Sequence, residues 1–234
     1  MKYLITSSLL DGLDWYMTCP KNWKESAKQD FISMIRREKR PVSEACQRGI
    51  DFENLVCKCN EMDNEQFRMF VTNQYFQKGF TGFQLETAVN IVCKMASIIK
   101  GGKQQVRVMK DMVFGDNEYH LFGYIDVLFP NKIVDIKTTK KYTEGYNYVK
   151  RSQHYIYSFC TGINIFEYLV ADYKETSFPC SLKRIEFEMT QDENKWVLEK
   201  RINDLFSFLK ENNLFEDYCN IFTLGHNDNE RGGK

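Results

Sequence analysis

No apolar run in this 234-residue sequence reaches the roughly 18 residues that a membrane-spanning helix needs. A secretory signal is also missing, because Asp11 interrupts the short apolar patch near the start of the chain. We therefore expect a soluble intracellular protein with no membrane partner. Prolines number only four, and no Pro-, Gly- or Ser-rich linker divides the sequence, so a single domain is expected.

An excess of either charge is also absent, since 32 Lys and Arg residues balance 32 Asp and Glu residues. This balance excludes a globally basic nucleic-acid-binding chain but leaves room for a local basic stripe. Between residues 132 and 151, six basic residues stand against two acidic ones; the basic residues are Lys132, Lys137, Lys140, Lys141, Lys150 and Arg151. Charge runs are usually solvated surface, so this stripe alone indicates no function.

The eight cysteines include no CxxC pair and no zinc-type spacing. Without a secretory signal, we expect reduced and mostly buried thiols. The three histidines lack metal-ligand spacing, and the sequence contains neither a P-loop nor a G-x-S-x-G motif. Zinc, P-loop nucleotide and serine-hydrolase chemistry are therefore unsupported.

The first hundred residues have helical periodicity. Helices are predicted over residues 21–39, ended by Pro41, then from an N-cap at Ser43, and over 63–78 and 83–100. The second of these helices carries an apolar stripe that we expect to be buried: Ala45, Gly49, Phe52, Val56 and Cys59.

The pattern then changes to strands rich in β-branched and aromatic residues, over 106–115, 118–129 and 132–139. A helix over 146–161, strands over 165–173 and 182–188, and an amphipathic helix over 190–212 with Trp196 on its apolar stripe follow. This order predicts an α/β or α+β fold, a mixed sheet flanked by helices under an N-terminal helical lobe. Residues 225–234 are expected to form a flexible tail.

The segment GYIDVLFPNKIVDIKTTKK contains two apolar strands around Pro130-Asn131. If those two residues form the turn, Phe129 pairs with Lys132, and Asp126 lies directly opposite Asp135. Lys137 shares their face, because side chains alternate along a strand. A longer turn would shift this register.

Two facing carboxylates on buried strands repel each other, and a hard divalent cation such as Mg²⁺ relieves that repulsion. The alternative is that Asp126 faces water at a strand end and that Asp135 and Lys137 form a surface pair. The apolar residues around both aspartates favour the first interpretation.

Three further polar residues have ambiguous positions. Glu53 borders the apolar stripe of its helix, so it lies either at the exposed rim or toward a site. Gln153 and Tyr157 are four residues apart and share a helix face, where they either contact substrate or form an ordinary semi-polar surface.

Taken in order, Gly49-x3-Glu53, Asp126, Asp135-Ile136-Lys137 and Gln153-x3-Tyr157 resemble the PD-(D/E)XK nuclease superfamily. The likeness is to its RecB-type branch, which includes phage exonucleases and CRISPR spacer-processing nucleases. The N-terminal segment SSLLDGLDWYMTCPKNW resembles the entry segment of that branch, and the resemblance spans residues 6 to 173.

The resemblance implies a role for each of these residues. Glu53, Asp126, Asp135 and the Ile136 carbonyl would bind Mg²⁺ or Mn²⁺, and Lys137 would position or activate the attacking water. Gln153 and Tyr157 would set the active-site helix and contact the DNA backbone. By charge alone, Lys140, Lys141, Lys150 and Arg151 are expected to contact phosphates.

The sequence departs from the branch in two respects. Many members have His where this chain has Glu53, and some hold an iron–sulfur cluster on one early and three late cysteines. Cys19 matches the early position, but only Cys180 and Cys219 lie late in the chain, so no cluster is expected.

The implied activity is metal-dependent hydrolysis of DNA, as an exonuclease of phage or mobile-element type in recombination or repair, in the cytoplasm. The domain would span 1–224, with a helical part over 1–100, a catalytic core over 101–190 and a C-terminal helix over 190–213. An annealing or recombination protein is a compatible partner. Two alternatives stay open, a non-catalytic binding module on the same fold and a nuclease directed at RNA or acting in defence.

Overall fold

One mixed sheet of seven strands organises the residues that the computed structural model describes, 2–143 and 146–224. The strand order is β6-β5-β4-β3-β1-β7, with β2 paired to β3 off this path. The strands are β1 (Lys2–Thr6), β2 (Lys103–Phe114), β3 (Asn117–Leu128), β4 (Lys132–Thr139), β5 (Ile165–Asp172), β6 (Ser181–Glu188) and β7 (Thr223–Leu224). The predicted tail over 225–234 lies outside the described residues.

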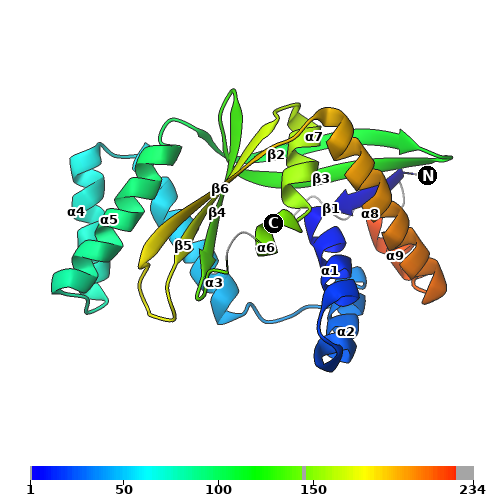
Figure 1. Ribbon diagram of the computed structural model, residues 1–234, viewed down its shortest axis with the longest axis horizontal. Helices are drawn as coiled ribbons and strands as arrows, with labels where there is room; N and C mark the ends of the chain where they lie inside the picture. The colour runs from blue at the N-terminus through cyan, green and yellow to red at the C-terminus, as the bar shows by residue number, and fades with distance from the viewer. Residues whose placement is uncertain (1, 144–145, 225–234) are drawn as a thin grey trace.

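Helices cover both faces of the sheet (Figure 1). One apolar cluster lies under α3 (Glu44–Cys57), α4 (Asn64–Gln77) and α5 (Gly82–Ile99). The other lies under α1 (Ser7–Thr18), α2 (Lys24–Ile35), α7 (Gln153–Thr161), α8 (Gln191–Glu211) and α9 (Phe215–Phe222). Side chains of strand β5 point alternately into the two clusters. Phe166 and Tyr168 belong to the cluster under α1, α2 and α7–α9, whereas Leu169 and Ala171 belong to the cluster under α3–α5.

Along one of its edges, strand β3 pairs first with one strand and then with another. Parallel β1 pairs with residues 118–122, and antiparallel β4 pairs with Val127 and Leu128. Residues 123–126 pair with neither of these strands. Residues two apart on a regular strand share one face, yet Ile125 packs under α7 and α8 while Val127 packs under α3–α5. The face of the strand therefore switches at Asp126.

The predicted fold class, a mixed sheet flanked by helices with helices at the N-terminal side, is confirmed. The Ser43 cap is also confirmed, since the Ser43 hydroxyl accepts a hydrogen bond from the Cys46 backbone N–H. The eight cysteines form no disulfide, but the expectation of mostly buried thiols is wrong, since only Cys19 and Cys59 are buried, Cys46 is exposed and the other five are partly buried. No described helix has both the length and the hydropathy needed to cross a membrane.

Several predicted boundaries and faces are wrong. Strand β1 lies in a segment expected to be helical, and α2 ends at Ile35, well before Pro41. The helix expected over 146–161 is broken into α6 (Tyr146–Val149) and α7 by a turn at 150–152. Ala45 is exposed because the first turn of α3 extends beyond the core, and Trp196 is 65% exposed on the outer face of α8.

Candidate active site

Asp126 lies where β3 and β4 stop pairing. The predicted turn is confirmed, because the Phe129 N–H donates to the Lys132 carbonyl at 2.9 Å and Val127 pairs with Val134. The ladder ends there, one pair before the two aspartates. Instead, Asp126 Oδ2 accepts a hydrogen bond from the Ile136 N–H at 2.8 Å. The Asp126 carboxylate thus takes the place of a β3 backbone carbonyl as the acceptor for the Ile136 N–H.

Asp135 is the central residue of the site and is 1% exposed. Its Oδ2 lies 2.5 Å from the Lys137 ammonium, and its Oδ1 accepts a hydrogen bond from Gln153 Nε2 at 2.9 Å. The same Gln153 nitrogen lies 3.4 Å from the Tyr157 hydroxyl. The structure therefore brings together four residues that the motif spacing singled out, from β4 and α7.

Tyr157 is buried against β3 because position 123 is glycine. A Cβ atom at Gly123 would overlap the Tyr157 ring and lie 3.0 Å from its hydroxyl. Helix α7 can approach the sheet this closely only in the absence of a side chain there. Gly123 was not among the residues that the sequence singled out, and a glycine inside a strand pattern is the signal for such a close approach.

Glu53 is partly buried on α3, where the charges of Asp135 and Lys137 act on it in opposite directions. Its Oε1 accepts a hydrogen bond from Gln105 Nε2 on β2. Gln105 has a left-handed backbone, with φ of 50°, and interrupts the β2–β3 pairing opposite Asp126. Sequence reasoning missed Gln105, because a left-handed glutamine inside a β-rich segment leaves no trace in the residue pattern.

The negative charges of the carboxylates at this site repel one another, which disfavours their ionised forms. Burial raises the pKa of Asp126 well above its usual value, and the charge of Asp135 raises it further. Burial followed by the Asp135 charge likewise raises the pKa of Glu53. Burial raises the pKa of Asp135 against the opposing charge of Lys137. Burial lowers the pKa of Lys137, but Asp135 and Asp126 outweigh it, so the net pKa is raised.

The predicted phosphate-contacting cations are spread over two segments. The charge of Arg151 acts on the site, where it lowers the pKa of Asp135. The Lys150 carbonyl accepts a hydrogen bond from Arg201. Lys140 and Lys141 are exposed just beyond the end of β4, and no contact links their side chains to Asp135 among the described residues. The charge of Arg151 therefore links this set to Asp135.

Carboxylate oxygens are the type of ligand atom that a hard divalent cation binds. Three carboxylates repel one another in a partly apolar setting, and oxygen ligands are those that Mg²⁺ and Mn²⁺ prefer. Within residues 2–143 and 146–224, however, no three His, Cys, Asp or Glu side chains are gathered as a metal-binding cluster. The carboxylates are engaged instead by Ile136, Lys137, Gln153 and Gln105.

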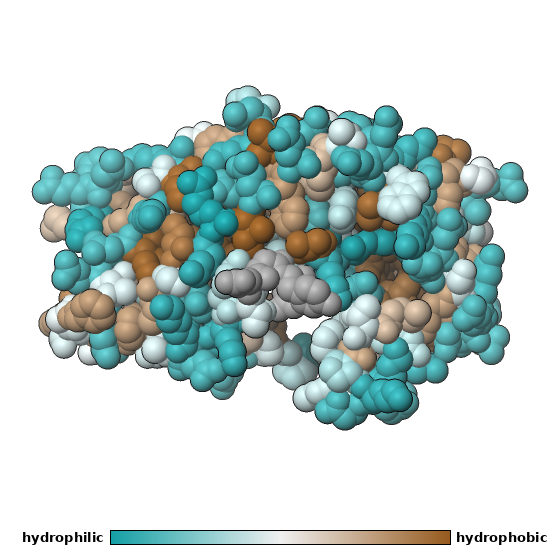
Figure 2. Space-filling view, in the orientation of Figure 1, coloured by the Kyte–Doolittle hydropathy of each residue, from teal (hydrophilic) through white to brown (hydrophobic). Residues whose placement is uncertain are grey.

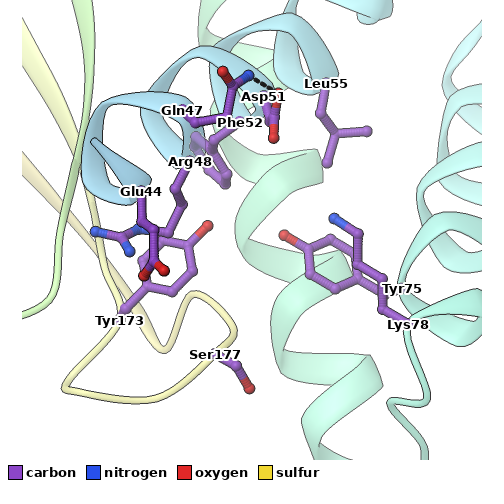
Figure 3. Close-up of a pocket in the computed structure, with 10 residues that line it drawn as sticks. All are labelled: Glu44, Gln47, Arg48, Asp51, Phe52, Leu55, Tyr75, Lys78, Tyr173 and Ser177. Carbon is purple, nitrogen blue, oxygen red and sulfur yellow. Dashed lines mark hydrogen bonds between the residues drawn. The ribbon is translucent and has the colours of Figure 1, made fainter. Parts of the chain in front are cut away.

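The space-filling view shows the surface hollowed between α3 and the pair α1 and α2 (Figure 2). A separate pocket of about 310 Å³ lies between α3, the end of α4 and the β5–β6 turn (Figure 3). Tyr75 and Tyr173 form its aromatic walls, and Arg48 and Lys78 lie at its edge with Glu44 and Asp51. This pocket contains none of the predicted site residues.

No protein-family model matches the chain, and no curated protein matches it in sequence. Among solved structures, it is similar to an alkaline exonuclease, LHK-Exo, from Laribacter hongkongensis, with 14% identity, 92% of this chain and 90% of that chain covered, and a TM-score of 0.46. The complex of LHK-Exo with dAMP matches with 14% identity, 92% and 91% coverage and a TM-score of 0.45. SSO0001 matches with 11% identity, 78% and 86% coverage and a TM-score of 0.40.

Proposed function

We propose that this protein is a metal-dependent nuclease that hydrolyses phosphodiester bonds in DNA, with residues 1–224 acting as one domain. The observation that carries this proposal is the arrangement around Asp135, where Lys137 and Gln153 contact its two oxygens and where the Asp135 charge raises the pKa of both Asp126 and Glu53. These residues come from α3, β3, β4 and α7, and a purely structural sheet would have no use for repelling carboxylates there. The sequence resemblance favours an exonuclease of RecB type.

Asp126, Asp135, Glu53 and the Ile136 carbonyl are the residues that would hold Mg²⁺ or Mn²⁺. Such an ion supplies polarisation of the scissile phosphate and a more acidic water. The residues of the chain do the remaining work. Lys137 presents an ammonium beside the carboxylates, where it orients the attacking water and offsets charge on the phosphate oxygens. Gln153 fixes the orientation of the Asp135 carboxylate, and Arg151 supplies a cation for the DNA backbone.

The test is cleavage of end-labelled linear and closed circular DNA, each single- and double-stranded, with Mg²⁺, Mn²⁺ or EDTA. An RNA strand of the same sequence is included. Wild type is compared with Lys137→Ala and Asp135→Asn, and with Lys94→Ala, an exposed lysine on α5, as the matched control. Metal-dependent loss of linear DNA only, abolished in the two site variants and retained in K94A, is the expected result.

Other outcomes assign other functions. Cleavage of circular DNA would make the protein an endonuclease, and preferential cleavage of RNA would make RNA its substrate in place of DNA. DNA binding without cleavage under any metal would replace the proposal with a non-catalytic binding module. Equal cleavage by K137A and wild type would show that the activity does not depend on this site.

A further inference from the structure

The turn at residues 150–152, between α6 and α7, is held by side chains from two distant helices. Asp11 on α1 accepts a hydrogen bond from the Ser152 N–H at 2.6 Å. Arg201 on α8 donates from one nitrogen to the Lys150 carbonyl at 2.8 Å and to the Ser152 hydroxyl at 2.7 Å. Ser152 is fully buried, so these bonds are shielded from water.

Local capping does not hold the start of α7. Ser152 occupies the N-cap position, but its side chain makes no capping hydrogen bond, and its backbone is helical rather than extended. Its hydroxyl is instead engaged by Arg201. The position of this turn therefore depends on Asp11 and Arg201 rather than on the sequence of the helix itself.

Charge links the same turn to the candidate active site. Asp11 Oδ2 lies 3.6 Å from Arg151, and Asp11 Oδ1 lies 3.9 Å from Arg201. Asp11 is mostly buried between these two arginines, whereas the Arg151 side chain is half exposed. The charge of Arg151 also lowers the pKa of Asp135, so the Asp11 carboxylate pairs with a cation whose charge acts on the site.

The residue after the turn is Gln153, whose amide contacts Asp135 at 2.9 Å. Ser152 thus lies between Gln153, which contacts Asp135, and Arg151, whose charge acts on Asp135. A shift of the turn would move both, because each is joined to Ser152 by a single peptide bond. Two side chains from α1 and α8 therefore hold the turn that carries Arg151 and leads into Gln153.

We propose that Asp11 and Arg201 are positioning residues for phosphodiester hydrolysis, acting through Arg151 and Gln153. This inference rests on the proposed function. A merely structural role would tie α1, α7 and α8 together and would lower stability without a specific effect on turnover. A positioning role lowers kcat and raises the metal concentration needed for half-maximal cleavage, because Gln153 orients a carboxylate of the metal site.

The test is a mutant cycle on cleavage of linear DNA under single-turnover conditions with saturating enzyme. Asp11→Ala is expected to slow cleavage about 10- to 100-fold, as loss of a supporting partner typically does. In a background that already carries Arg151→Ala and Gln153→Ala, D11A should change the rate by less than about twofold. Tyr218→Phe, which loses a buried hydrogen bond to the Leu4 carbonyl far from the site, should cleave at the wild-type rate.

Two milder variants keep the test valid if D11A does not fold. Asp11→Asn retains an acceptor for the Ser152 N–H but loses the charge beside Arg151, and Arg201→Lys cannot reproduce the paired contacts to residues 150 and 152. Both are expected to slow cleavage and to speed hydrogen exchange at the Ser152 and Gln153 amides. Wild-type exchange and wild-type cleavage in both variants would overturn the inference.

The outcomes separate this inference from the proposed function. If wild type shows no metal-dependent cleavage, the proposed function fails and the positioning role fails with it. If wild type cleaves and D11A, D11N and R201K cleave equally well, only the positioning role fails. An equal effect of D11A in the wild-type and the R151A/Q153A backgrounds would also overturn it, since Asp11 would then act independently of the two side chains.

Discussion

The Asp126 carboxylate accepts a hydrogen bond from the Ile136 N–H at 2.8 Å, across the position where β3 and β4 cease to pair. A side chain thus takes the place of a backbone acceptor, and the strand face switches at the same residue. The opening exposes the carboxylate to Asp135 and Glu53 while keeping the Ile136 N–H satisfied. The sheet is therefore interrupted at the point where the proposed chemistry requires polar groups.

Asp126→Asn should stabilise the metal-free protein and abolish its response to metal. Asparagine retains an oxygen acceptor for the Ile136 N–H but removes one of three mutually repelling charges. We expect a gain of about 1 kcal/mol, or ~2–4 °C in Tm for a domain of this size. Thermal unfolding with and without Mg²⁺ measures both effects.

The exposed Asp204→Asn on α8 serves as the control for Asp126→Asn and should match wild type. Wild type should melt at higher temperature with Mg²⁺, because an ion that binds only the native state stabilises it. A less stable D126N protein that still gains stability from Mg²⁺ would contradict both the repulsion and the metal assignment.

Local sequence was sufficient to predict the β3–β4 turn and its register. Pro130-Asn131 marks the turn, and alternation along the two flanking strands then fixes which residues share a face. The Phe129–Lys132 bond confirms that register. The early end of the ladder was not predictable, because it depends on Asp126 competing with the β3 backbone for the Ile136 N–H.

Long-range contacts explain the errors. Strand β1 has five residues and pairs in parallel with residues 118–122, so its partner lies more than a hundred residues away. The helical pattern over 146–161 is continuous in sequence, but Asp11 and Arg201 hold a turn at 150–152. Neither effect leaves a local signal, since each depends on residues brought near only by folding.

Gln105→Gly should be more stable than Gln105→Ala. A left-handed backbone costs a residue with a Cβ atom roughly 1–2 kcal/mol, and glycine avoids that cost. Part of the gain is offset by the flexibility of glycine in the unfolded chain, so we expect a difference of about 1 kcal/mol. Urea unfolding of the two variants side by side measures it.

Both Gln105 variants also lose the amide that holds Glu53. Each should therefore need about 10-fold more Mg²⁺ for half-maximal cleavage, by the usual effect of removing a supporting hydrogen bond. Because the lost contact is common to both, the metal requirement should not differ between them. An unchanged requirement would show that Gln105 does not orient Glu53 for metal.

Two glycine substitutions should have opposite effects on stability. At Gly123 a Cβ atom would overlap the buried Tyr157 ring, so Gly123→Ala should cost roughly 1–3 kcal/mol. At Gly49 a Cβ atom would meet only the Thr138 hydroxyl at 3.6 Å, an ordinary contact. Gly49→Ala should therefore stabilise α3 by ~0.5–1 kcal/mol.

Cleavage assays extend the glycine comparison to the site. Displacement of Tyr157 by G123A should also displace Gln153, whose amide lies 3.4 Å from the Tyr157 hydroxyl, and cleavage should fall. Thermal unfolding combined with cleavage at a temperature where both variants remain folded separates the two effects. Full activity in a destabilised G123A protein would show that Tyr157 is structural only.

His154 should make the protein less stable in mild acid. The ring is fully buried, stacked 4.5 Å from Phe187, with Nδ1 3.2 Å from the Tyr168 hydroxyl. Burial, assisted by the charge of Arg201, lowers the pKa of His154 to about 3. Below about pH 6.5 the unfolded chain takes up a proton at this residue that the folded chain does not, so acid favours unfolding.

The loss grows by about 1.4 kcal/mol for each pH unit, so it should reach roughly 2–3 kcal/mol at pH 4.5 and stop growing below about pH 3. His154→Phe keeps an aromatic ring against Phe187 but cannot titrate, and it should lose about 1 kcal/mol at pH 7 with the Tyr168 hydrogen bond. As the pH falls, H154F should overtake wild type in urea unfolding. Parallel stability curves for H154F and wild type between pH 7 and 4.5 would show that His154 accepts a proton in the folded protein. The prediction that its buried ring stays neutral would then be wrong.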